Sequence, residues 1–494
     1  MKLKDKIGLE ITNFLYPYIT DYTKMRGDNM PRNVMNYDEY CLQEKYLWFL
    51  GEEDLIADFY QTRTNNFSII DTRASYFYAN VGSDLRVVHS GLAGLISHGK
   101  ANLLVNGGIE AKILNTRGNE DKNKTEQLTE ILEDNKIKNL IYQSALTLSW
   151  GKRFAWKISL DKEVTDKPIV EKYNPFNYEA IYKRNRLHEI IFKQKYDYET
   201  GFELHEIYGK GYIKYTLYKI TKTGMKEMPL DYLEETKDLE DVEWNEKVML
   251  AAEMCIEKSD YKGIVSELDA LDEAWSQLID EIRTARAETY IPDILMNGKQ
   301  FDRLRKRYVE TSTDDREGAK NEISHNQPDI RSEEYVNTIL ALRENILANV
   351  GLNAITIGID DTAGANASGT ALEKRETVSL RTREQMIGEW ETFLTQFYQL
   401  LLFANVDDFI ELKQRNFIEE NVVVEFGSYI TPNFEQLIEQ VKALIDSDLV
   451  DHEKALDMLY GDTLSEEERV RILANVGTLT FEEEGDIDGE QDTE

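Results

Sequence analysis

The chain of 494 residues carries 92 acidic and 58 basic side chains, which gives a formal net charge of −34. A protein that grips nucleic acid normally presents a basic face, so this balance argues against tight DNA or RNA binding. It remains compatible with a surface along which DNA passes without adhering. The length allows two or three domains with substantial cores.

Membrane, metal and redox signals are weak throughout the sequence. No apolar run approaches the roughly eighteen residues that a membrane span needs, and the N-terminus lacks a signal-peptide core, so we expect no membrane association. Two cysteines, Cys41 and Cys255, and six scattered histidines show no metal-ligand spacing. We therefore expect no metal site and no cofactor.

The first half of the chain predicts helices followed by strands. Helical spacing of apolar residues predicts helices within 37–63, 85–105 and 124–150, with Gly51 interrupting the first. Segments between about 152 and 220 are short, often alternating and rich in β-branched and aromatic residues, which is typical of strands. Those strand segments are KRFAWKISL, HEIIFKQKY, FELHEIY and YIKYTLYKI.

The second half predicts three long helices, which makes the fold class α+β and mainly helical. The first has one apolar stripe and ends near Pro292; the stripe consists of Ile264, Leu268, Leu271, Trp275, Leu278 and Ile282. The second carries Tyr335, Ile339, Leu342 and Ile346 on one face and stops at Gly351. The third runs from about Thr370 to Phe403, roughly 50 Å. Its packed stripe comprises Met386, Trp390, Phe393, Phe397, Tyr398 and Leu401.

Two glycine-containing segments match a phosphate-binding loop only in part. GLISHGKA, from Gly94 to Ala101, has the lysine of GxxxxGK[ST], but alanine replaces the hydroxyl that would hold Mg²⁺. We interpret it as a helix with small residues at a packing contact. Gly364 and Gly369 have the loop spacing, but no lysine lies between them and Thr370 follows directly.

Acidic residues at helical spacing could be catalytic carboxylates, but they more often form the solvated face of an amphipathic helix. We adopt the second interpretation for Asp269, Asp272, Glu273, Asp280 and Glu281. His89 and His98 are interpreted as core or surface histidines. No Ser/His/Asp set stands out, so the sequence predicts no catalytic residue and no enzyme.

Two further segments carry concentrated charge. Asp360 and Asp361, in GIDDTAGANASGTALEKRET, could ligate a metal only with oxygens brought from elsewhere, so we expect them to solvate a loop. The basic run RLRKRY, 303–308, could contact phosphate or pair with acidic neighbours in a self-assembly. The charge balance favours pairing between subunits.

The order of the segments resembles the portal proteins of tailed double-stranded DNA bacteriophages, particularly those of phages with Gram-positive hosts. LWFLGEEDLIADFY is similar to their N-terminal wing helix, and RVVHSGLAGLISHGKANLLVNGG to the segment that follows it. LDALDEAWSQLIDEIRTARAETYIPDILM resembles the first stem helix and its exit toward the clip. ILANVGLNAITIGIDDTAGANASGTALEKRE resembles the second stem helix, the tunnel loop and the start of the long wing helix. The resemblance covers about 40–475 in the same order, and no single motif in it is highly specific.

The resemblance implies a portal fold with wing, stem, clip, tunnel loop and crown, assembled as a ring of about twelve copies at one capsid vertex. The implied regions are the wing (1–262), first stem helix (263–290), clip (291–332), second stem helix (333–350), tunnel loop (351–369), long wing helix and return strand (370–430), crown (431–480) and an acidic disordered tail (481–494).

The same resemblance implies the sites and partners. The tunnel loop would line the DNA channel with Asp360, Asp361, Thr362, Ala363, Gly364, Ala365 and Asn366. Clip contacts to other subunits or to adaptors would come from Arg303, Arg305, Lys306 and Arg307. The partners would be further copies of the chain, double-stranded DNA, terminase, major capsid and scaffolding proteins, and head–tail adaptors. The location would be the virion, and the host cytoplasm during assembly.

Two alternatives stay open on the sequence. One is an acidic cytosolic enzyme with a nucleotide site at Gly94–Lys100, and the other is a different virion structural protein. The missing Ser or Thr at position 101 speaks against the first. The second would share the lack of catalytic motifs but would not explain the order of helix, clip, helix, loop and helix.

Overall fold

The structure is a computed structural model. It describes residues 37–63, 75–82, 84–196, 201–221, 224–285, 288–292, 295, 308–312, 322–359, 369–406 and 409–428, and parts of 438–473. The chain divides into two compact units, of which the first comprises 1–360 and 376–427 and the second 361–375 and 428–494. Within the described ranges, no helix combines the length and apolar character that crossing a bilayer requires.

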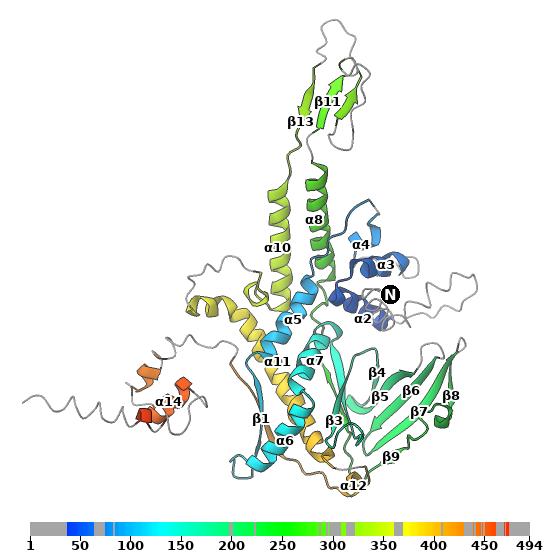
Figure 1. Cartoon of the computed structure of the whole chain (residues 1–494), viewed down its shortest axis with the longest axis vertical. Coiled ribbons are helices and arrows are strands. Elements are labelled where there is room, and N and C mark those ends of the chain that lie inside the picture. Colours follow the sequence, from blue (N-terminus) through cyan, green and yellow to red (C-terminus); the bar gives the residue numbers. More distant parts are fainter. Residues whose placement is uncertain are drawn as a thin grey trace, which may run out of the picture. The chain divides into compact units, whose positions relative to one another are not determined.

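Among its described residues, the N-terminal part of the first unit contains six helices (Figure 1): α2 (Tyr37–Leu50), α3 (Glu53–Arg63), α4 (Phe77–Asn80), α5 (Leu92–Val105), α6 (Lys122–Asp134) and α7 (Ile137–Gly151). The predicted break at Gly51 is confirmed, and its φ of 70° is left-handed, a conformation that glycine adopts without steric cost. The helix predicted from residue 85 begins only at Leu92, so His89 lies outside it. Helix α5 packs against α2 and α7.

Antiparallel strands follow these helices, as the alternating segments predict. The six-stranded sheet has the order β4 (Tyr178–Lys183), β5 (Arg186–Tyr196), β6 (Phe202–Gly209), β7 (Tyr212–Thr221) and β8 (Gly224–Met228), with β9 (Val242–Glu243) also paired to β7. A three-stranded sheet has the order β10 (Ala251–Cys255), β2 (Arg153–Ser159) and β3 (Ile169–Tyr173). The short 3-10 helix η2 (Leu230–Tyr232) follows β8.

A two-stranded sheet joins distant parts of the sequence. Strand β1 (Ile109–Leu114) pairs antiparallel with β14 (Asn421–Phe426), with Ile109 opposite Phe426. The sequence predicts a strand near β14 but not β1.

The second half of the first unit holds the long helices. In chain order, its elements are α8 (Val265–Thr284), the strands β11 (Glu288–Pro292), β12 (Tyr308–Thr311) and β13 (Ser324–Asn326), then α10 (Ser332–Val350), η3 (Ile355–Ile357), α11 (Gly369–Ala404) and α12 (Phe409–Gln414). The residues of α11 up to 375 belong to the second unit. The second unit contains α14 (His452–Tyr460) among its described residues. The extent predicted for the longest helix is confirmed within one residue at each end.

The main core forms where α11 lies against strand β2. Trp390 stacks on Phe154 with ring centroids 5.4 Å apart, and Phe393 and Phe397 meet the Trp156 ring edge-on at 5.2 and 5.0 Å. Burial of such large aromatic side chains stabilises a core strongly. The predicted stripe of α11 is therefore confirmed, with Met386 at its margin.

Strand β3 contributes a measurable pH dependence through Lys172. Burial lowers the pKa of this lysine from 10.5 to about 8. Between these two values the unfolded chain binds more protons than the folded one, so the unfolding free energy contributed by Lys172 rises with pH. We expect Lys172→Met to be more stable than wild type below pH 8, and the difference to shrink as the pH approaches 10.5.

Urea unfolding at pH 7, 9 and 10 checks this expectation, with the exposed Lys210→Met as the matched control. A stability difference for Lys172→Met that stays constant across this range would contradict it.

Candidate functional site

The two sets of residues that the resemblance assigns to function lie outside the described residues. One is the predicted channel segment: Asp360, Asp361, Thr362, Ala363, Gly364, Ala365 and Asn366. The other is the basic set of the clip: Arg303, Arg305, Lys306 and Arg307. Both assignments stay predictions. The elements that flank them are described, and these are α8, α10, α11 and the small sheet between the first two.

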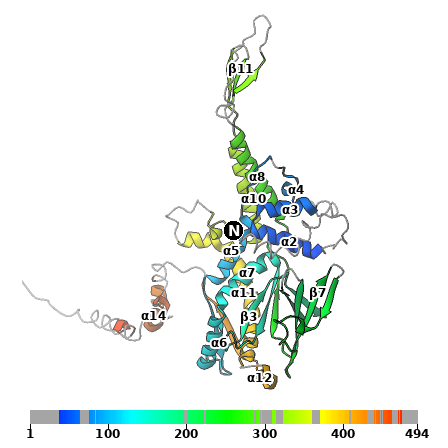
Figure 2. The same ribbon diagram turned by 45° about the vertical axis from the view of Figure 1, so that its right-hand side comes forward.

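Helices α8 and α10 run side by side (Figures 1 and 2). The apolar stripe predicted for α8 is buried at Leu268, Leu271 and Leu278, but Trp275 is only partly buried and Ile282 is 49% exposed. On α10 the buried residues are Ile339, Ile346, Leu347 and Val350, whereas the predicted Tyr335 and Leu342 are only partly buried. The stripe prediction therefore holds for most of both helices, and its clear failure is Ile282 on the last turn of α8.

A three-stranded sheet occupies the chain between the two helices. Strand β11 is central and pairs in parallel with β12 and antiparallel with β13. The prediction that the first helix ends near Pro292 is wrong, because α8 ends at Thr284 and Pro292 is the last residue of β11. A proline tolerates this place because a strand end needs no further ladder bond from its nitrogen.

An ion pair links the ends of the two helices beside this sheet. The Arg331 guanidinium donates from Nε and Nη2 to the two carboxylate oxygens of Glu281, each at 3.3 Å, and these hydrogen bonds lower the pKa of Glu281. Both side chains are reached by solvent, so the pair contributes little to overall stability. It links the residue before α10 to the last turn of α8.

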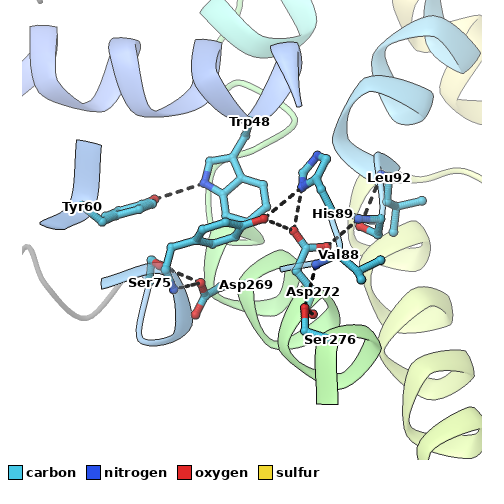
Figure 3. A network of polar contacts seen from close by, with 11 residues as sticks. Trp48, Tyr60, Ser75, Val88, His89, Leu92, Asp269, Asp272 and Ser276 are labelled. Carbon is cyan, nitrogen blue, oxygen red and sulfur yellow. Dashed lines mark hydrogen bonds and ion pairs between the residues drawn. The ribbon is translucent and has the colours of Figure 1, made fainter. Parts of the chain in front are cut away.

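Asp269 of α8 is buried, with 3% of its surface exposed, so its assignment to a solvated face is wrong (Figure 3). Its carboxylate accepts hydrogen bonds from the Ser75 hydroxyl at 2.6 Å and from the backbone N–H groups of Tyr76 and Phe77 at 2.8 Å each. The N–H of Tyr78 donates to it at 3.3 Å. Asp269 thereby satisfies the free N–H groups at the start of the short helix α4.

Asp272, one turn further along α8, is fully buried and holds the chain just before α5. Its Oδ2 accepts from the Tyr78 hydroxyl at 2.9 Å and lies 2.7 Å from Nδ1 of His89, while Oδ1 accepts the Ser90 N–H at 2.8 Å. The Ser276 hydroxyl accepts the N–H of Val88 at 2.9 Å (Figure 3). The interpretation of Asp272 as solvated is therefore also wrong. Of the two interpretations of His89, core or surface, the structure supports the first, since its side chain is 6% exposed.

The pKa shifts of Asp269 and Tyr78 are those of groups that hold another segment in place. Burial raises the pKa of Asp269, and the surrounding hydrogen bonds oppose the rise. Burial and the neighbouring Asp272 carboxylate raise the pKa of Tyr78, so its hydroxyl stays protonated and can donate. Because protein donors occupy both oxygens of each carboxylate, Asp269 and Asp272 fasten residues 75–90 to α8 rather than present a free base.

A weak signal for these anchors exists in the sequence. Asp269, Asp272 and Ser276 follow the helical spacing of i, i+3 and i+7, and each aspartate directly follows a leucine of the buried stripe. They therefore sit at the border of the apolar face. What lies over that border depends on residues about 190 positions away, such as Ser75 and Tyr78.

The partial phosphate-loop motif is not a loop. Gly94 to Lys100 lie inside α5, and the Lys100 ammonium donates to Asp260 at 2.5 Å. A Cβ at Gly99 would come within 2.6 Å of Ile357, so glycine there permits close packing. The interpretation as a helix with small residues at a packing contact is confirmed. Among the described side chains, no three His, Cys, Asp or Glu residues gather as a metal site requires.

Comparisons with known proteins add little to this geometry. No protein-family model matches the chain, and no curated protein matches it. Among solved structures, a chain from the virion of a native gene transfer agent (GTA) particle is similar with a TM-score of 0.40 and 8% identity, over 75% of this chain and 89% of that one. A TM-score of this size is too low to carry a conclusion about fold or function.

Proposed function

We propose that the chain is a phage portal protein. It would form an oligomeric ring at one capsid vertex, conduct DNA during packaging and ejection, and serve as the docking platform for terminase and head-completion proteins. The observation that carries the proposal is the order of elements along the chain: helix α8, a small sheet, helix α10 packed on α8, and then the 36-residue helix α11. This order matches the order of the segments that resemble portal proteins.

The charge of the chain fits a conduit. Each copy carries a net charge of −34, and a ring of about twelve copies would multiply it. Acidic walls repel phosphates, so DNA would pass without the adhesion that concentrated basic residues cause. The chain itself would be no enzyme, and a separate terminase would supply the energy for movement.

The buried carboxylates have a mechanical role in this proposal. A stem helix beside moving DNA must keep its place relative to the wing. Asp269 and Asp272 attach α8 to residues 75–90 through hydrogen bonds to carboxylates, which are stronger than those between neutral groups. The stem would thus be held by directional bonds as well as by apolar packing.

Electron microscopy of the purified chain tests the proposal directly. We expect rings with a central hole, and native mass spectrometry should report about twelve copies. Monomers or small open assemblies at every protein and salt concentration would overturn it. A closed particle without a hole would instead favour another virion structural protein.

The predicted channel segment gives a second test. Deleting Ala363 to Ala367 should leave ring assembly unchanged and abolish retention of packaged DNA, because the shortened segment could not reach the duplex. The matched control keeps the length and changes Ala363, Ala365 and Ala367 to serine, and it should retain DNA. Lost assembly without a separate DNA defect would identify the segment as a structural connector.

A further inference from the structure

One turn of α11 holds the chain that precedes the predicted channel segment. Ser379 is fully buried, and its hydroxyl oxygen accepts the N–H of Asn353 at 2.9 Å and the hydroxyl of Thr356 at 2.7 Å. Thr382, three residues further along the same turn, donates its hydroxyl to the carbonyl of Gly351 at 2.7 Å. The end of α10 and helix η3 are therefore tied to α11 by side-chain hydrogen bonds.

The neighbouring residue Arg383 ties two other segments to the same turn. Its guanidinium donates from Nε to the carbonyl of Leu103 at 2.6 Å and from Nη2 to the carbonyl of Gly427 at 2.5 Å. Gly427 in turn donates its N–H to the carbonyl of Gly108 at 3.0 Å. The end of α5 and the chain after β14 thus meet at a buried arginine.

Close backbone approach shows that these contacts are tightly fitted. Gly351 has a left-handed φ of 71°, and a Cβ there would lie 2.4 Å from the Thr382 hydroxyl. Any residue larger than glycine would therefore displace the hydroxyl that binds its carbonyl.

This turn of α11 is connected to the places where the chain passes from one unit to the other. The chain passes between its two units after residues 360, 375 and 427. The hydrogen bonds of Ser379, Thr382 and Arg383 hold 351–356 before the first passage and Gly427 at the third, and α11 itself continues from the second. The same turn therefore fixes the first-unit chain beside every passage.

Resting on the proposed function, we propose that Ser379, Thr382 and Arg383 form an α11 clamp, a set of positioning residues. The clamp sets the point from which the channel-lining segment departs. Neighbouring subunits of a ring would then present this segment at one height, because each copy fixes its base by the same hydrogen bonds. The clamp lies wholly within the first unit, so it works before any partner binds.

The test combines Ser379→Ala with Thr382→Val, which keeps the size of the threonine and removes its hydroxyl. Thr382→Ser restores that hydroxyl and serves as the rescue, and Thr392→Val changes an exposed threonine of α11 whose hydroxyl binds only Gly388 of its own helix. Hydrogen exchange of residues 351–359 should accelerate about tenfold in the combined variant, as expected for losing buried hydrogen bonds. Exchange should stay at the wild-type rate in Thr382→Ser and Thr392→Val.

The functional readout separates positioning from stability. We expect the combined variant to form rings and to lose DNA retention, while Thr382→Ser and Thr392→Val retain DNA. Unchanged exchange at 351–359 would show that the clamp does not hold this chain, and accelerated exchange with normal DNA retention would show that it does not position the channel segment. Absence of rings in the wild type would instead overturn the proposed function, and the exchange result would still decide whether the clamp exists. Thr382→Val alone provides the same comparison if the combined variant does not fold.

Discussion

Asp269→Ala is expected to lower the free energy of unfolding by about 3 kcal/mol, because a buried donor left without its acceptor costs about 1–3 kcal/mol. The substitution would leave the Ser75 hydroxyl and the N–H groups of Tyr76, Phe77 and Tyr78 without their acceptor. Asp269→Asn keeps one carbonyl oxygen as an acceptor, so its free energy of unfolding should fall by less than that of Asp269→Ala.

Chemical denaturation measures the loss, and hydrogen exchange at 75–80 locates it. Asp280→Ala is the matched control, since Asp280 belongs to the same helix and is only partly buried. Asp280→Ala should change the free energy of unfolding by no more than about 0.5 kcal/mol, as for most substitutions away from buried contacts. Equal losses for the two variants would refute the anchoring role of Asp269.

Gly427→Ala should also be strongly destabilising, by about 3 kcal/mol, as for a side chain forced into a packed interior. A Cβ at Gly427 would lie 1.8 Å from the carbonyl oxygen of Gly107. This oxygen belongs to the backbone, and no side-chain torsion can move a Cβ away from it. The paired strands β1 and β14 would have to separate at this end, and the carbonyl bound by Arg383 would move.

Gly388→Ala, in the middle of α11, is the opposite case. A Cβ there would meet nothing within 4 Å. The substitution should therefore raise the free energy of unfolding by about 0.5–1 kcal/mol through helix propensity alone. Thermal or urea unfolding of the two variants checks both expectations. If Gly427→Ala proved as stable as Gly388→Ala, the close approach of Gly107 and Gly427 would be contradicted.

Local patterns in the sequence are enough to predict most of the described helices and five of the strands, namely β2, β5, β6, β7 and β14. The stripe of α11 from Trp390 to Leu401 repeats at three and four residues, and the structure buries it against β2. The alternation of HEIIFKQKY predicts β5 because successive strand side chains point to opposite faces. Such patterns work because they depend on neighbours within a few residues.

The sequence predicts less well where a helix begins or ends and which of its faces meets solvent. Helix α8 ends at Thr284 rather than near Pro292 because the chain there enters the small sheet, in which Tyr290 pairs with Val309 and with Ser324, residues far from it in the sequence. Helix α5 begins at Leu92 because Asp272 binds His89 and Ser90 and Gly91 before the helix has a left-handed φ of 68°.

The sequence by itself determined the acidic character, the α+β class, the long helices and the segment order that resembles portal proteins. Only the tertiary structure decided that Asp269 and Asp272 are buried anchors, that β1 pairs with β14, and that Ser379 and Arg383 bind backbone of other segments. The physical reason is the same in each case. A carboxylate, a hydroxyl or a strand edge is satisfied equally well by water or by protein, so its role depends on which distant segment the fold brings to it.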